Sequence, residues 1–180
     1  MNTELSGQTE LPGINQPPEP ARPPNLTKRT RREPKEWKLV TLRECPAPES
    51  MTRVQSPQDA VDYWKAHVTR AAHFNPDCEC VVVLLLNTRK RIRGHTLISV
   101  GSLSEATAHP REIFRIAVMA AAHSLILMHN HPSGEPDPSD SDQRLTRQVR
   151  DAGKILGIPL CDHVIVGHQR YFSFLESGLM

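Results

Sequence analysis

The chain has 180 residues, which suits one globular domain with a polar extension and is too short for two domains of ordinary size. Only 4% of the residues are aromatic and the formal net charge is +2, so neither an aromatic nucleic-acid platform nor binding of a polyanion by the whole molecule is expected. The longest apolar run, residues 81–86, is far shorter than the roughly 18 residues that a membrane helix needs.

The first residues show no basic segment followed by an apolar core, so no secretory signal is predicted and a cytoplasmic location is the expectation. Without secretion, the cysteines favour a reduced state over a disulfide framework. The pair in Cys78-Glu79-Cys80 is interpreted as small core residues, with the start of a thiolate metal site as the alternative.

Residues 1–36 are rich in proline and poor in large apolar side chains, which predicts a disordered tail. A basic run lies inside this tail and consists of Lys28, Arg29, Arg31, Arg32 and Lys35. We interpret it as a solvated charge run, with weak non-specific nucleic-acid contact through phosphates as the alternative.

Residues 56–59 carry the signals of a helix start: Ser56 as the N-cap, Pro57 at the first helical position and Asp59 in the first turn. A helix over residues 57–72 is predicted. Its buried face is expected to comprise Ala60, Val61, Trp64, Val68 and Ala71.

The rest of the chain alternates strands and helices. A hairpin is predicted from strands at 79–86 and 91–100. A helix opens at His109-Pro110-Arg111-Glu112, with an apolar face of Ile113, Ile116, Ala117, Ala120 and Ala121. A wholly apolar central strand at 124–128, a helix at 140–156 ended by Gly157, and strands at 162–166 and 170–174 follow. The fold class predicted is α+β, with mixed layers of helices and sheet.

The informative stretch is His129-Asn130-His131-Pro132, followed by Ser139 and Asp142. Residues two apart on a strand point to the same face, so both imidazoles can reach one ion at the zinc distance of about 2.0–2.1 Å. The turn formers between residues 132 and 138 can return the chain, so that Asp142 adds a carboxylate oxygen. Three protein ligands leave one position for water, which is the arrangement of catalytic zinc.

Such a site also needs a base and a donor for the developing oxyanion. Glu79, at the start of a strand, suits the first role, and an exposed strand residue without a role is the alternative. Ser139 suits the second, but Ser139 and Asp142 can equally cap the helix at 140–156. Asp162-His163 can orient a metal ligand or form a surface hydrogen-bonding pair, and both alternatives stay open.

These residues resemble the JAB/MPN domain metalloproteins, and within them the RadC-like branch. The JAMM motif is a Glu at a strand start, His-x-His-Pro, then a Ser and an Asp three residues later, which Glu79, His129, His131, Ser139 and Asp142 match. The RadC-like features are HNHPSG at 129–134, PSDSD at 138–142, HPREIF at 109–114 and DHVIVG at 162–167. The resemblance extends from about residue 50 to the C-terminus.

The resemblance implies a central mixed sheet flanked by helices, of the cytidine-deaminase-like kind, in a RadC-like JAB metalloprotease domain over residues 50–180. It implies one zinc ion per chain on His129, His131 and Asp142, with Glu79 as general acid/base and Ser139 on the oxyanion. Hydrolysis of peptide or isopeptide bonds is the function expected. The alternative is a non-catalytic, metal-stabilised DNA-repair or DNA-associated binding module. Full-length members of the branch typically have a helix-hairpin-helix segment before this domain, and no copy is recognisable here.

Overall fold

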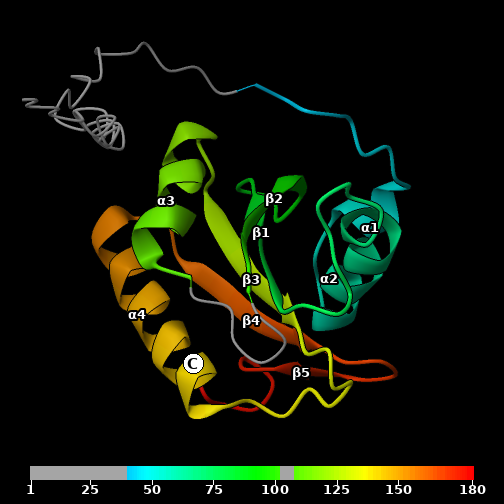
Figure 1. Cartoon of the computed structure of the whole chain (residues 1–180). Helices are drawn as coiled ribbons and strands as arrows, with labels where there is room; N and C mark the ends of the chain where they lie inside the picture. Colours follow the sequence, from blue (N-terminus) through cyan, green and yellow to red (C-terminus); the bar gives the residue numbers. More distant parts are fainter. Residues whose placement is uncertain (1–39, 102–107) are drawn as a thin grey trace, which may run out of the picture. The chain divides into compact units, whose positions relative to one another are not determined.

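The computed structural model describes residues 40–101 and 108–180, so the predicted tail of residues 1–36 and its basic run lie outside the described residues. The described strands form one five-stranded sheet in the order β2-β1-β3-β4-β5 (Figure 1). They are β1 (Cys80–Leu86), β2 (Ile92–Val100), β3 (Ser124–Asn130), β4 (Leu160–Val166) and β5 (Tyr171–Ser173). The β3–β4 pair is parallel and the other pairs are antiparallel. This mixed sheet confirms the predicted α+β class and the hairpin.

The helices cover both faces of the sheet (Figure 1). They are α1 (Glu49–Thr52), α2 (Pro57–Tyr63), the π-helix η1 (Trp64–Val68), α3 (Pro110–Met119) and α4 (Asp140–Leu156). None of the helices in the described ranges is long and apolar enough to span a membrane. The one-turn helix α1 follows Pro48 and was not predicted from the sequence.

The first predicted helix starts where expected and ends early. The Ser56 and Asp59 side chains accept from each other's backbone N–H groups in a capping box. The helix then widens into η1, where the Thr69 N–H donates to the Trp64 carbonyl at 3.2 Å, and the chain turns before residue 72. The wider π turn keeps Trp64 and Val68 buried but ends the periodicity on which the longer prediction rested.

Helix α3 begins as predicted, with His109 as the N-cap and Glu112 in the first turn. Its predicted apolar face is wrong at one position, because Ala121 is exposed and lies beyond the helix with φ at +49°. The Ala122 N–H reaches back to the Ala117 carbonyl at 2.9 Å, and this hydrogen bond closes the helix end through a left-handed residue.

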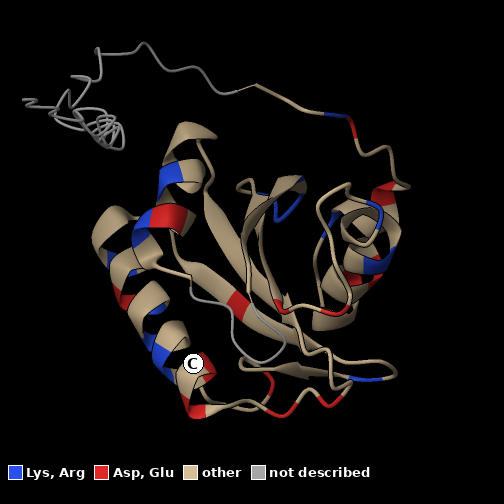
Figure 2. Ribbon diagram, in the orientation of Figure 1, with Lys and Arg blue, Asp and Glu red and all other residues tan. Residues whose placement is uncertain are grey.

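The sheet separates two apolar cores. Alternate residues of β1 point to opposite faces, so Val82 and Leu84 pack with Trp64 on one side, whereas Val81 and Val83 pack with α3 and α4 on the other. All residues of β1 and β3 are buried, and neither strand contains Lys, Arg, Asp or Glu; Figure 2 shows the charges gathered mainly on helices and loops. The prediction that β3 is a central strand is confirmed.

Helix α4 has the predicted bounds. It starts at the N-cap Ser139 and ends at Gly157, whose φ of +68° is the left-handed conformation expected of a C-terminal glycine. Its buried residues recur at helical spacing and face the sheet; they are Asp142, Thr146, Val149 and Gly153. The first two of these positions are polar and lie at the helix end that approaches β3.

Candidate metal centre

Strand β3 places two histidines on the face covered by α4. His129 continues the alternation of Leu125 and Leu127, which pack into the core on that side, so its side chain also faces α4. His131 follows the last residue of β3, and its N–H still pairs with the Val166 carbonyl at 3.1 Å. Both imidazoles therefore leave the same face of the sheet end.

Glu79 reaches the two histidines because β1 runs antiparallel to β3. Val81 lies opposite His129 in this pairing, so the residue two positions earlier lies beside the end of β3. The Asn130 side chain accepts from the Cys80 N–H and donates to the Cys78 carbonyl, each at 3.0 Å. It thereby holds the backbone on both sides of Glu79, a role that the sequence analysis missed.

The loop after His131 docks on the turn between β4 and β5. The Gly134 carbonyl accepts from the His168 N–H at 3.1 Å, and Glu135 forms an ion pair with Arg170. Gly134 has φ at +86°, and a Cβ atom there would lie 2.5 Å from the His168 ring. Only glycine permits this close approach, which returns the chain to the metal centre at Ser139.

Asp142 and Ser139 form a capping box at the start of α4. The Ser139 Oγ accepts from the Asp142 N–H at 3.2 Å and donates to the Asp142 Oδ2 at 2.6 Å. The capping alternative from the sequence is therefore present in the structure. It does not compete with metal binding, since the same box turns the Asp142 carboxylate toward both histidines.

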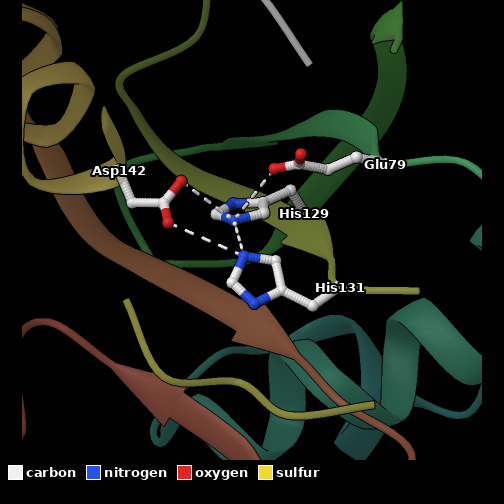
Figure 3. A group of neighbouring side chains, drawn as sticks. All are labelled: Glu79, His129, His131 and Asp142. Carbon is white, nitrogen blue, oxygen red and sulfur yellow. Dashed lines mark hydrogen bonds and ion pairs between the residues drawn. The ribbon is translucent and has the colours of Figure 1, made fainter. Parts of the chain in front are cut away.

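Four side chains converge on one point, as Figure 3 shows: Glu79, His129, His131 and Asp142. Their ligand atoms all lie within 4.8 Å of one another. The His129 Nε2 lies 3.1 Å from the His131 Nε2, 3.2 Å from the Asp142 Oδ1 and 3.4 Å from a Glu79 oxygen. The His131 Nε2 lies 3.6 Å from the Asp142 Oδ2.

These separations suit a tetrahedral ion. Ligands bound at 2.0–2.1 Å around a tetrahedral metal lie about 3.3 Å apart, close to the 3.1–3.6 Å between the donor atoms of His129, His131 and Asp142. The His131 Nδ1 lies 2.8 Å from the Glu135 carbonyl, which can only accept, so the neutral ring carries its proton on Nδ1 and offers the Nε2 lone pair. The group of four residues could therefore hold a metal ion.

The charges of the centre are strongly coupled. The hydrogen bond to Asp142 raises the pKa of His131 above its ordinary value, against the opposing effect of burial. Burial alone would raise the pKa of Asp142, but hydrogen bonds with His129 and His131 hold it well below its usual range. Two buried carboxylates facing two imidazoles thus give a site that attracts a cation.

Asp162 and His163 are both buried, so the structure excludes the surface pair that the sequence left open. His163 is fully enclosed, with its Nε2 at 2.9 Å from the His129 Nδ1 and its Nδ1 at 2.7 Å from the Thr146 hydroxyl. Asp162 accepts from the His163 and Leu175 N–H groups and from the Ser173 hydroxyl. Thr146 was not identified from the sequence, where it is one of several polar residues on an amphipathic helix.

Other glutamate side chains in this part of the chain do not join the described metal group. Glu112 caps α3, Glu135 is exposed beside Arg170, and Glu105 lies outside the described residues. The described cysteines are all free, as expected, and Cys80 is buried. Among the residues that the structure describes, the candidate metal group contains no cysteine, so the thiolate alternative gains no support.

Comparison with known proteins matches residues 54–179 to the RadC-like JAB domain. A UPF0758 protein of Chlorobaculum parvum is 41% identical over 128 residues, which are 71% of this chain and 55% of that protein. A UPF0758 protein of Trichlorobacter lovleyi is 42% identical over 132 residues, which are 73% of this chain and 55% of that protein. The chain thus spans about half the length of the curated relatives it matches.

The matched range contains all four residues of the candidate metal group and the strands and helices that position them. Together, the mixed sheet, the convergent Glu-His-His-Asp group and the extent of the match show that the chain belongs to the RadC-like JAB domain family.

Proposed function

We propose that this chain is a zinc-dependent hydrolase of amide bonds, of the metallopeptidase or isopeptidase type. The observation that carries the proposal is the convergence of two imidazole nitrogens and two carboxylates at spacings of 3.1–3.6 Å. Three of these residues, His129, His131 and Asp142, would hold the ion. A mixed nitrogen and oxygen donor set of this size is typical of catalytic zinc.

Zinc at this position would supply a Lewis acid that acidifies water and polarises an amide carbonyl. Glu79 is the residue we assign to proton transfer. Its carboxylate is buried and lies 3.4 Å from the His129 Nε2, beside the three proposed ligands. It would take a proton from the attacking water as the new C–O bond forms and pass it to the leaving nitrogen as the C–N bond breaks.

Ser139 is the residue we assign to the oxyanion. Its hydroxyl lies 2.6 Å from the Asp142 Oδ2 and 2.8 Å from the Ser141 Oγ, so its proton has an acceptor within the capping box. Donation to a substrate oxygen would require that proton to turn away from Asp142, with Ser141 remaining as a partner for the Ser139 oxygen.

The test is turnover of peptide and isopeptide substrates by the zinc-loaded full chain. Glu79→Gln is expected to retain zinc and lose turnover by about 10²–10⁴-fold, because it keeps the shape of the side chain and removes the base. Glu112→Gln, the same change in the α3 cap, serves as the matched control and should keep activity. Full activity in Glu79→Gln would show that another residue is the base. A zinc-loaded wild type that cleaves no amide substrate would overturn the proposal.

A second candidate function is the DNA-associated binding module, which the basic run at residues 28–35 favours. Five cations close together would give a DNA affinity that falls steeply with salt as counterions are released. Deleting residues 1–36 separates the two candidates: loss of salt-dependent DNA binding with the tail supports the binding module, and unchanged cleavage after the deletion supports the enzyme.

A further inference from the structure

His163 lies directly behind His129, on the side away from the other proposed ligands. The two imidazoles meet at 2.9 Å between the His129 Nδ1 and the His163 Nε2. His163 is completely buried, and its ring stacks on Phe174 with centroids 4.8 Å apart and planes at 7°. This ring has no access to substrate, so any effect on the candidate metal centre must pass through its hydrogen-bond partners, His129 and Thr146.

The directions of the hydrogen bonds around His163 follow from the donor inventory. The Thr146 hydroxyl has one proton and lies 2.6 Å from the Asp142 backbone carbonyl, which can only accept. That proton therefore goes to the carbonyl, and the Thr146 oxygen presents a lone pair to the His163 Nδ1 at 2.7 Å. The His163 proton must then reside on Nδ1.

A fully buried imidazole between an aromatic ring and a hydroxyl is neutral, because burial penalises the charged form. With its proton on Nδ1, His163 has a lone pair on Nε2 and accepts a hydrogen bond from the His129 Nδ1. His129 then carries a proton on Nδ1, and its Nε2 is the atom that faces Glu79, His131 and Asp142.

We propose that His163 and Thr146 are positioning residues that fix His129 as the Nδ1–H tautomer and aim its Nε2 lone pair at the metal. The inference rests on the proposed function for the identity of the ion, and the proton on the His129 Nδ1 can be tested without metal. The order of hydrogen bonds is Asp142 carbonyl, Thr146, His163, His129, so the same four groups also tie β3 to the start of α4. Two proposed ligands on separate elements, His129 and Asp142, are thereby held in fixed positions relative to each other.

The surroundings of His163 keep it in this orientation. The Asp162 carboxylate accepts from the His163 backbone N–H at 2.7 Å and from the Leu175 N–H at 3.0 Å. The Phe174 N–H donates to the His163 carbonyl at 3.0 Å. These bonds hold the C-terminal turn against β4 and place the Phe174 ring on the imidazole.

The first experiment is ¹⁵N NMR of the imidazole rings in the metal-free full chain. We expect His163 to give the pattern of a neutral Nδ1–H tautomer and His129 to carry a proton on Nδ1. Thr146→Val, which keeps the shape and removes the acceptor, should convert His163 to a mixture of tautomers, and Thr146→Ser should retain the wild-type pattern. An unprotonated Nδ1 of His129 in the wild type, or an unchanged pattern in Thr146→Val, would overturn the inference.

The second experiment is zinc affinity, measured by competition with a chromogenic chelator. Loss of a residue that orients a metal-binding histidine typically weakens affinity about 10–100-fold, and we expect this of Thr146→Val and His163→Phe. Thr146→Ser and His163→Gln keep a hydroxyl and an acceptor, respectively, and should bind zinc nearly as the wild type does. If His163→Phe fails to fold, the comparison of Thr146→Val with Thr146→Ser tests the inference. Equal zinc affinities of these two variants would overturn it.

The two experiments separate this inference from the proposed function. A wild type that binds zinc with the predicted tautomer but cleaves no amide would overturn the hydrolase and leave the positioning role supported. If the wild type cleaves amides but the His129 Nδ1 carries no proton, the hydrolase is supported and the positioning role is overturned.

Discussion

Two histidine clusters lie on opposite faces of the sheet and differ in the charges around them. The candidate metal centre on the α4 face combines His129 and His131 with two carboxylates. On the other face, His67 and His95 lie beside Tyr63, whose hydroxyl is 3.1 Å from the His95 Nδ1. Burial and the cationic side chain of Arg43 lower the pKa of both imidazoles.

The same residue type therefore has opposite properties in the two clusters. Burial, reinforced by Arg43 and His67, lowers the pKa of His95 to about 4, whereas Asp142 raises the pKa of His131. Within residues 40–101 and 108–180, only the first cluster has the composition and spacing of a metal group. Neighbouring carboxylates, rather than the histidines themselves, decide whether a buried cluster suits a cation.

The largest expected effect is on bound metal. His129→Ala in the full chain should reduce the zinc content from about one ion per chain to near zero, because a ligand and its converging lone pair are lost. His95→Ala, the same change in the other cluster, should leave the zinc content unchanged. Elemental analysis of both variants checks this. Zinc retained in His129→Ala would contradict the assignment of the metal to the cluster that contains His129.

The next effect is the pH dependence of stability. In metal-free protein, the contribution of His131 should be fully present below its unfolded-state pKa of about 6.5 and lost as pH rises through its higher folded-state pKa. Zinc requires neutral imidazoles, so the stability that zinc adds should instead grow over the same pH range.

Urea unfolding from about pH 5.5 to pH 8.5, a range around the histidine pKa, gives the slope of the free energy of unfolding against pH with and without zinc. Asp142→Asn should flatten both, because the mutation removes the partner that raises the pKa of His131. Slopes of the same sign with and without metal would contradict the assignment of His131 as a ligand.

A smaller effect separates the two roles of Ser139. Ser139→Ala should destabilise α4 by about 1 kcal/mol through loss of the N-cap, and Ser139→Gly by only a few tenths. If the hydroxyl also stabilises the oxyanion, both variants should lose turnover alike, by about 10²–10³-fold. Thermal unfolding and kcat measured together check this, and turnover that follows stability would restrict Ser139 to capping.

The smallest effect is expected at His67, whose buried Nε2 has no hydrogen-bond partner among the described residues. Replacing an unsatisfied polar atom by an apolar group can be nearly neutral, so His67→Phe should change the free energy of unfolding by less than about 1 kcal/mol. Zinc content should not change. A large loss of stability in urea unfolding would show that this cluster carries a polar function after all.

Local signals predicted most of the elements. The capping residues Ser56, His109 and Ser139 and the C-terminal Gly157 mark helix boundaries that the structure reproduces. These signals work because they act over three or four residues of chain. The end of the first helix was missed, since the π-helical turn of η1 depends on packing of Trp64 and Val68 against the sheet.

The sequence by itself determined the fold class, the central strand and the candidate residues of the metal centre, because periodicity and short motifs are local properties. Only the tertiary structure decided how they meet. The antiparallel register of β1 and β3 brings Glu79, fifty residues earlier than His129, to the same point, and Asn130 holds it there. His163 and Thr146 acquire their places behind His129 only when β4 and α4 pack on β3, a contact that no local pattern encodes.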